Sequence, residues 1–139
     1  MFILVSFKTT FEDVYGSGCN PQEYTGTEYT ERINESSFEN VSVRDCVFRN
    51  ISSSENGGAL YCSSSVHRLL VEQSSFISCI TSYIYGGGIR SNSRQCVLSR
   101  ICAFNCCSTN SSNSNSYGQF AYINTNDKNH VNDTQLHIH

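Results

Sequence analysis

The chain has 139 residues, enough for one domain, and a formal net charge of −3. Its nine Lys and Arg residues are scattered, so the sequence offers no basic surface for nucleic acid or acidic membranes. Ser and Asn together form over a quarter of the chain, a composition common in disordered segments, yet aromatic residues reach 12%. Regularly spaced aromatics and a single Pro favour an ordered, β-rich structure.

The first 37 residues fit no clear repeat. We expect a strand over the apolar residues 1–7, followed by a loop region or a degenerate repeat unit. The apolar run lacks a basic flank and is too short for a secretion signal, and no stretch of the sequence is long enough to span a bilayer. We therefore expect any export signal or membrane contact to depend on parts outside this chain.

Residues 38–139 carry an internal repeat of about 28 residues. Residues 41–53, 69–81 and 97–109 align without gaps, and their anchors Phe48, Phe76 and Phe104 are equally spaced at this period. A glycine motif interleaves with the anchors, at Gly57-Gly58, at Gly86-Gly87-Gly88 and, weakly, at Gly118. The distance from motif to next anchor is nearly constant, while the distance from anchor to motif varies. This asymmetry predicts fixed strands and one variable loop.

Short β-branched runs separated by polar corners predict strands rather than helices, since apolar residues at helical spacing are lacking. Each repeat unit is long enough for about three short strands with their corners. We therefore predict an all-β fold, a right-handed, single-stranded parallel β-helix of about four or five rungs, cut from a longer solenoid. Rungs stacked ~4.8 Å apart would place equivalent positions directly over one another.

Stacking predicts three side-chain columns. Phe48, Phe76 and Phe104 would form an inward aromatic stack, and Ile51, Cys79 and Cys107 a small apolar column. Arg44, Glu72 and Arg100 would form an exposed column of alternating charge, whose ion pairs contribute ~0–1 kcal/mol each. The glycines would allow φ > 0 and a close approach of each loop to the rung below.

The eight cysteines lack the paired spacing of a metal site, so we expect no metal and no cofactor. Cys79 and Cys107 would lie ~4.8 Å apart in neighbouring rungs, a separation that permits a disulfide. The alternative is that the thiols stay free and pack as small apolar groups. The sequence leaves both alternatives open.

Five Asn-x-Ser/Thr sequons are candidate N-glycosylation sites and give weak support for a secretory route. They lie at Asn34, Asn40, Asn50, Asn110 and Asn132.

The Gly57-Gly58-Ala59-Leu60 and Gly86-Gly87-Gly88-Ile89 segments resemble the Gly-Gly-Ala-Ile motif of the polymorphic outer-membrane-protein repeats. Those repeats occur in chlamydial autotransporters, and related ones in large surface proteins of parasitic protists. Their second motif, Phe-x-x-Asn, is degenerate here, because Phe76 is followed by Cys79 and Phe104 by Cys107. The resemblance covers roughly residues 38–139 and implies a pectin-lyase-like β-helix in an adhesin-like surface protein without catalytic residues.

We therefore expect a non-catalytic, extracellular or cell-surface glycoprotein that serves as an adhesive surface or stalk. Its expected partners are glycans or host and cell-surface proteins. The alternative is a polysaccharide-active lyase or hydrolase whose catalytic rungs lie outside this chain. Such chemistry needs clustered carboxylates, and most of the acidic residues fall within residues 1–39. A degenerate coding fragment without a function of its own is the third interpretation.

Overall fold

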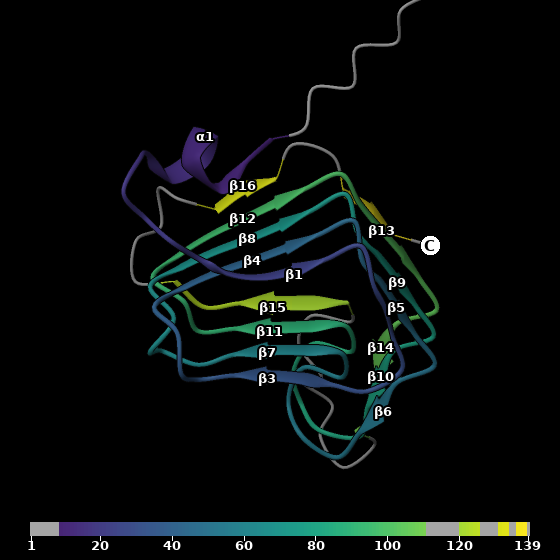
Figure 1. The fold of residues 1–139 in the computed structure, drawn as a ribbon. Coiled ribbons are helices and arrows are strands. Elements are labelled where there is room, and N and C mark those ends of the chain that lie inside the picture. Colours follow the sequence, from purple (N-terminus) through teal and green to yellow (C-terminus); the bar gives the residue numbers. More distant parts are fainter. Residues whose placement is uncertain (1–8, 111–119, 126–130, 134–135, 139) are drawn as a thin grey trace, which may run out of the picture.

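The computed structural model describes residues 9–110, 120–125, 131–133 and 136–138. These residues form one short helix and many short strands, whose pairings are parallel (Figure 1). The prediction of an all-β fold with parallel sheets is confirmed. The strand predicted over residues 1–7 and the glycine at position 118 lie outside the described residues.

The strands belong to four sheets, which we name A to D. Sheet A has the order β1 (Gln22–Thr25), β4 (Asn40–Arg44), β8 (Arg68–Glu72), β12 (Gln95–Ser99) and β16 (Val131–Asp133). Sheet B has the order β2 (Glu28–Tyr29), β5 (Val47–Arg49), β9 (Ser75–Ile77), β13 (Ile101–Phe104) and β17 (Leu136–Ile138). Sheet C contains β3 (Ile33–Glu35), β7 (Leu60–Cys62), β11 (Ile89–Ser91) and β15 (Ala121–Ile123). Sheet D contains β6 (Ser52–Ser53), β10 (Ile80–Thr81) and β14 (Cys107–Ser108).

Consecutive strands lie in different sheets, and neighbours within a sheet come from successive repeats. The chain passes through sheets A, B, D and C and then returns to A (Figure 1). The first repeat is β4–β7, the second β8–β11 and the third β12–β15. Before them, β1, β2 and β3 pass through sheets A, B and C.

Residues with positive φ form two of the corners in each repeat. Between sheets A and B they are Asp45, Gln73 and Arg100, with φ of 53°, 46° and 53°. Between sheets B and D they are Asn50, Ser78 and Asn105, with φ of 54°, 52° and 51°. A single left-handed residue bends the chain sharply, and the same bend at equivalent positions keeps the following strands aligned.

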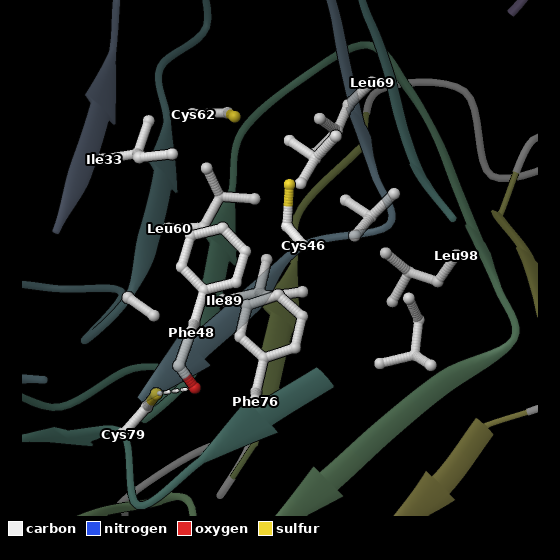
Figure 2. Close-up of a cluster of buried hydrophobic side chains, with 14 of the residues drawn as sticks. Ile33, Cys46, Phe48, Leu60, Cys62, Leu69, Phe76, Cys79, Ile89 and Leu98 are labelled. Atoms are coloured by element: carbon white, nitrogen blue, oxygen red, sulfur yellow. Dashed lines mark hydrogen bonds between the residues drawn. The ribbon is translucent and has the colours of Figure 1, made fainter. Parts of the chain in front are cut away.

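The core lies between the sheets and is built from inward-facing columns (Figure 2). In sheet B, Phe48 lies in register with Phe76 and with Tyr29. The Phe48 and Phe76 rings stack with centroids 4.6 Å apart, and Tyr29 stacks on Phe48 at 5.2 Å. Part of the predicted aromatic column therefore exists, extended at one end by Tyr29.

The prediction that Phe104 continues this column is wrong. The register pairs Phe76 with Ala103, and Phe104 points outward with 56% of its surface exposed. In sheet B, the number of residues between equivalent positions is therefore smaller by one from the second repeat to the third than from the first to the second. Phe120, just before β15, is buried and packs edge-on against Phe76 with centroids 5.2 Å apart, so Phe76 has an aromatic neighbour on each side.

The same shift by a single position corrects the other two predicted columns. Cys107 lies opposite Ile80 in sheet D, so the residue equivalent to Cys79 is Cys106, which is buried like Ile51. Ser99, and not Arg100, lies opposite Glu72. Arg100 at the adjacent corner nevertheless forms an ion pair with Glu72.

The N-terminal segment covers the outer face of sheet A (Figure 1). Its helix α1 (Phe11–Tyr15) begins at a capping box between Thr10 and Asp13. The Tyr15 hydroxyl donates to the Leu69 carbonyl at 2.6 Å, and the Thr9 amide donates to Glu72 Oε1 at 3.0 Å. This cover explains why the outward-facing Leu70 in the middle of sheet A is fully buried.

The glycine motif marks the entry to sheet C. Gly57 and Gly86 have φ of +70° and +61°. A Cβ on Gly58 would lie 2.0 Å from the Gly87 carbonyl oxygen, and one on Gly87 would lie 2.4 Å from the Cys107 backbone. The chain segments approach so closely here that only glycine fits.

Candidate binding site

A cavity of about 380 Å³ opens beside sheet C, where the first two repeats meet the chain segment that precedes them. Its lining consists of polar and aromatic residues, namely Arg32, Ser54, Glu55, Asn56, Tyr61 and Tyr83. Arg32 precedes β3, Tyr61 is the outward-facing residue of β7, and Tyr83 follows β10. Residues 54–56 belong to the loop between β6 and β7.

The Arg32 guanidinium is held on several sides. Its Nη1 lies 2.9 Å from Glu55 Oε2, and its Nε and Nη2 donate to the carbonyls of Gly57 and Asn56 at 2.8 and 2.7 Å. Its centre lies 5.3 Å from the Tyr61 ring centroid. Because Arg32 is fixed by these contacts, the charged part of the cavity is preorganised.

The loop that carries Glu55 is tied to the next repeat as well. The Thr81 hydroxyl donates to the Glu55 carbonyl at 2.5 Å, and the Tyr85 amide donates to Asn56 Oδ1 at 3.3 Å. Tyr83 lies between these two contacts along the chain, with its own amide donating to Thr81 Oγ1 at 3.0 Å. The Tyr83 side chain is 46% exposed at the cavity wall, so an apolar ring face stands beside a fixed ion pair.

Aromatic and guanidinium groups continue along the outer face of sheet C. Tyr61, Arg90 and Tyr122 lie in register on neighbouring strands. The Arg90 guanidinium lies 4.2 Å from the Tyr122 ring centroid and 4.5 Å from that of Tyr85. Its Nη2 donates to Asn92 Oδ1 at 2.9 Å, while Nε and Nη1 are buried without a hydrogen-bond partner among the described residues. Burying these N–H groups without partners costs free energy, and stacking of the guanidinium on the two rings offsets part of that cost.

The described wall of the cavity is poor in acidic side chains. Among the described residues that line it, Glu55 alone carries a carboxylate. Hydrolysis of a glycosidic bond normally uses a pair of carboxylic acids. The part of the chain that the structure describes also contains no group of three His, Cys, Asp or Glu side chains placed to hold a metal ion.

Sequence reasoning did not identify this site. Its residues come from three different connections and from strand β7 and share no motif. Neither Arg32 nor Tyr83 belongs to a predicted column. The one available signal was the outward-facing position next to each glycine motif, which holds Tyr61 and Arg90. Each of these two side chains takes part in a cation–π contact with another partner, Tyr61 with Arg32 and Arg90 with Tyr85 and Tyr122.

The predicted sequons lie on several faces. Asn34 and Asn50 are exposed, and Asn34 lies in register beside Tyr61. Asn40 and Asn110 are partly buried, and the backbone of Asn132 lies in β16 opposite Val97.

The two cysteines for which a disulfide was weighed, Cys79 and Cys107, are both free thiols in the structure. Their positions along sheet D also differ, because Cys107 lies opposite Ile80 rather than Cys79.

No protein-family model, curated protein or solved structure matches this chain. Among the described residues, no helix is long and apolar enough to cross a membrane.

Proposed function

We propose that the chain is a segment of a right-handed parallel β-helix of the pectin-lyase-like type. The ordered passage through sheets A, B, D and C supports this architecture, because equivalent residues of successive repeats lie in register. The left-handed corners recur in all three repeats and the close glycine contacts in the first two, as expected for a solenoid. The resemblance to polymorphic outer-membrane-protein repeats belongs to the same proposal.

The proposed role is non-catalytic binding of glycans by a secreted or cell-surface protein. The observation that carries it is the cavity in which the exposed Tyr83 ring adjoins the fixed Arg32–Glu55 pair. The C–H face of a sugar ring is apolar and packs on an aromatic face, while its hydroxyls pair with carboxylate, amide and guanidinium groups. Asn56 and Tyr61 provide further polar groups at the wall. A largely preformed hollow of this volume fits a mono- or disaccharide unit of a longer chain.

The test is a glycan-binding screen with the whole chain, followed by calorimetry on the best ligand. We expect Tyr83→Ala to weaken binding about tenfold, because the stacking face is lost. Phe104→Ala is the matched control, since it removes a similarly exposed aromatic that does not line the cavity. Equal losses in both variants, or no binding to any glycan, would refute the proposed site. Cleavage of a bound glycan would favour a carbohydrate-active enzyme instead.

A further inference from the structure

Cys79 and Cys106 occupy equivalent positions in the second and third repeats. Each follows a corner residue with positive φ, Ser78 and Asn105 respectively. The Cys107 amide donates to the Cys79 carbonyl at 3.2 Å, and Cys107 lies in register with Ile80. Cys106 is therefore the residue next to Cys79, at the usual ~4.8 Å between neighbouring strands. That spacing falls within the Cα range that a disulfide tolerates.

Both side chains point into the core and make matching contacts. Cys79 is fully buried and Cys106 is 8% exposed. The Cys79 thiol lies 3.5 Å from the Phe48 carbonyl (Figure 2), and the Cys106 thiol lies 3.3 Å from the equivalent carbonyl of Phe76. The Cys79 amide donates to Cys106 Sγ at 3.4 Å. The two sulfur atoms thus lie in one column with the same orientation.

We propose that Cys79 and Cys106 form an intramolecular disulfide that links the second repeat to the third when the protein meets a peroxide. The two thiols differ in acidity. A hydrogen bond with Cys79 lowers the pKa of Cys106, and the same bond, together with burial, raises the pKa of Cys79. Cys106 is therefore the nucleophile, and it is also the more accessible of the two.

The reaction balances with hydrogen peroxide as the oxidant. The Cys106 thiolate attacks one peroxide oxygen, the O–O bond breaks, and the products are a sulfenic acid and hydroxide. The hydroxide takes up the proton that Cys106 released and becomes water. Cys79 then attacks the Cys106 sulfur, an S–S bond forms, and the sulfenic oxygen leaves as a second water with the Cys79 proton. Two thiols are oxidised, and one peroxide is reduced to two waters.

The experiment treats the folded full-length chain with hydrogen peroxide, blocks free thiols, and maps the disulfides by non-reducing trypsin digestion. Cleavage after Arg90, Arg94 and Arg100 separates Cys79 from Cys106. Tandem mass spectrometry then assigns the partner by fragmentation between Cys106 and Cys107. We expect a Cys79–Cys106 cross-link and a rise in Tm of roughly 5–10 °C.

Two matched variants test the assignment independently. Cys107→Ser should keep the cross-link and the rise in Tm, whereas Cys106→Ser should lose both. The fold of each variant is checked by circular dichroism before oxidation, and the wild-type fragment assignment stands even if Cys106→Ser does not fold. A Cys79–Cys107 link, or no Cys79 cross-link under conditions that oxidise the exposed Cys102, would overturn the proposal.

Discussion

Phe48 and Phe76 stack with ring centroids 4.6 Å apart and planes inclined by only 5°. They do so because β5 and β9 hold them in register across sheet B. Both rings are fully buried, and Tyr29 and Phe120 pack at the two ends of the pair. The stack therefore joins the first repeat to the second through a direct apolar contact in the middle of the core.

Phe76→Ala should lower the free energy of unfolding by about 3–5 kcal/mol, because it removes a buried ring and leaves a cavity between two others. Phe104→Ala should change stability by less than about 0.5 kcal/mol, since that ring is mostly exposed. Urea denaturation followed by circular dichroism measures both changes. A similar loss for both variants would mean that Phe104, not Ala103, occupies the column.

Gly58→Ala should be strongly destabilising, because the new methyl group would meet the Gly87 carbonyl oxygen at 2.0 Å and the Ile80 carbonyl oxygen at 2.8 Å. Backbone atoms cannot move aside as a flexible side chain can, so we expect a loss of about 2–3 kcal/mol or more. Gly18→Ala is the control, since its φ of +84° imposes backbone strain without any atom within 4 Å of the new methyl. Its cost should stay near ~1 kcal/mol. Thermal unfolding of the two variants gives the comparison.

The ion pair between Glu72 and Arg100 should contribute more to the free energy of unfolding than the more exposed ion pairs do. Glu72 is 1% exposed under the N-terminal segment, whereas Arg100 keeps 31% of its side chain in solvent. Glu72→Gln should cost about 1–3 kcal/mol, less than a fully buried pair because solvent screens Arg100. Glu23→Gln, which removes the exposed partner of Arg44 at 3.3 Å, should cost under about 0.5 kcal/mol. Denaturant midpoints that shift equally in the two variants would contradict this ranking.

The repeat length and the all-β fold with parallel sheets could be predicted from the sequence, but the register of the third repeat could not. The number of residues from sheet A to sheet D is the same in all three repeats. Ser52 follows Val41 at the same distance as Ile80 follows Leu69 and Cys107 follows Cys96. The connections on both sides of sheet C vary. Residues 63–67 join β7 to β8, but only residues 92–94 join β11 to β12. The spacing of the glycine motifs and the Phe anchors, in contrast, predicts a variable length only for the connection before sheet C.

Relative to the first repeat, the connection before sheet C is one residue longer in the second repeat (residues 82–88 against 54–59), and the connection after it is two residues shorter. Together the two changes displace the three predicted columns by a single position. Matching Phe104 to Phe76 aligns two aromatics, but the residue in register with Phe76 is Ala103, and the aromatic contact on this side of Phe76 comes from Phe120. An aromatic supplied from a distant loop leaves no mark in the local pattern. The cavity at Arg32 and Tyr83 escapes prediction for the same reason, since only the stacking of repeats brings its residues together.

Buried thiols should make the protein lose stability at alkaline pH. Burial raises the pKa of Cys96 from 9.0 to about 12 and raises that of Cys62 well above 9.0. In the unfolded chain both thiols ionise near their ordinary pKa, so between pH 9 and 12 the unfolded state binds fewer protons than the folded one. The free energy of unfolding therefore falls as pH rises, by about 1.4 kcal/mol per pH unit for each thiol. The stability that is lost in this range is fully present below pH 9, where both thiols are protonated in the folded and the unfolded chain.

Cys96→Val tests this origin, because it keeps a small apolar group at a fully buried position and removes one ionisable thiol. The slope of unfolding free energy against pH between 9.5 and 11 should flatten by about 1.4 kcal/mol per unit relative to the native chain. Cys102→Val is the control and should leave the slope unchanged, because this side chain is exposed to solvent in the folded protein as it is in the unfolded chain. An unchanged slope in Cys96→Val would mean that the Cys96 thiol ionises in the folded protein as readily as in the unfolded chain.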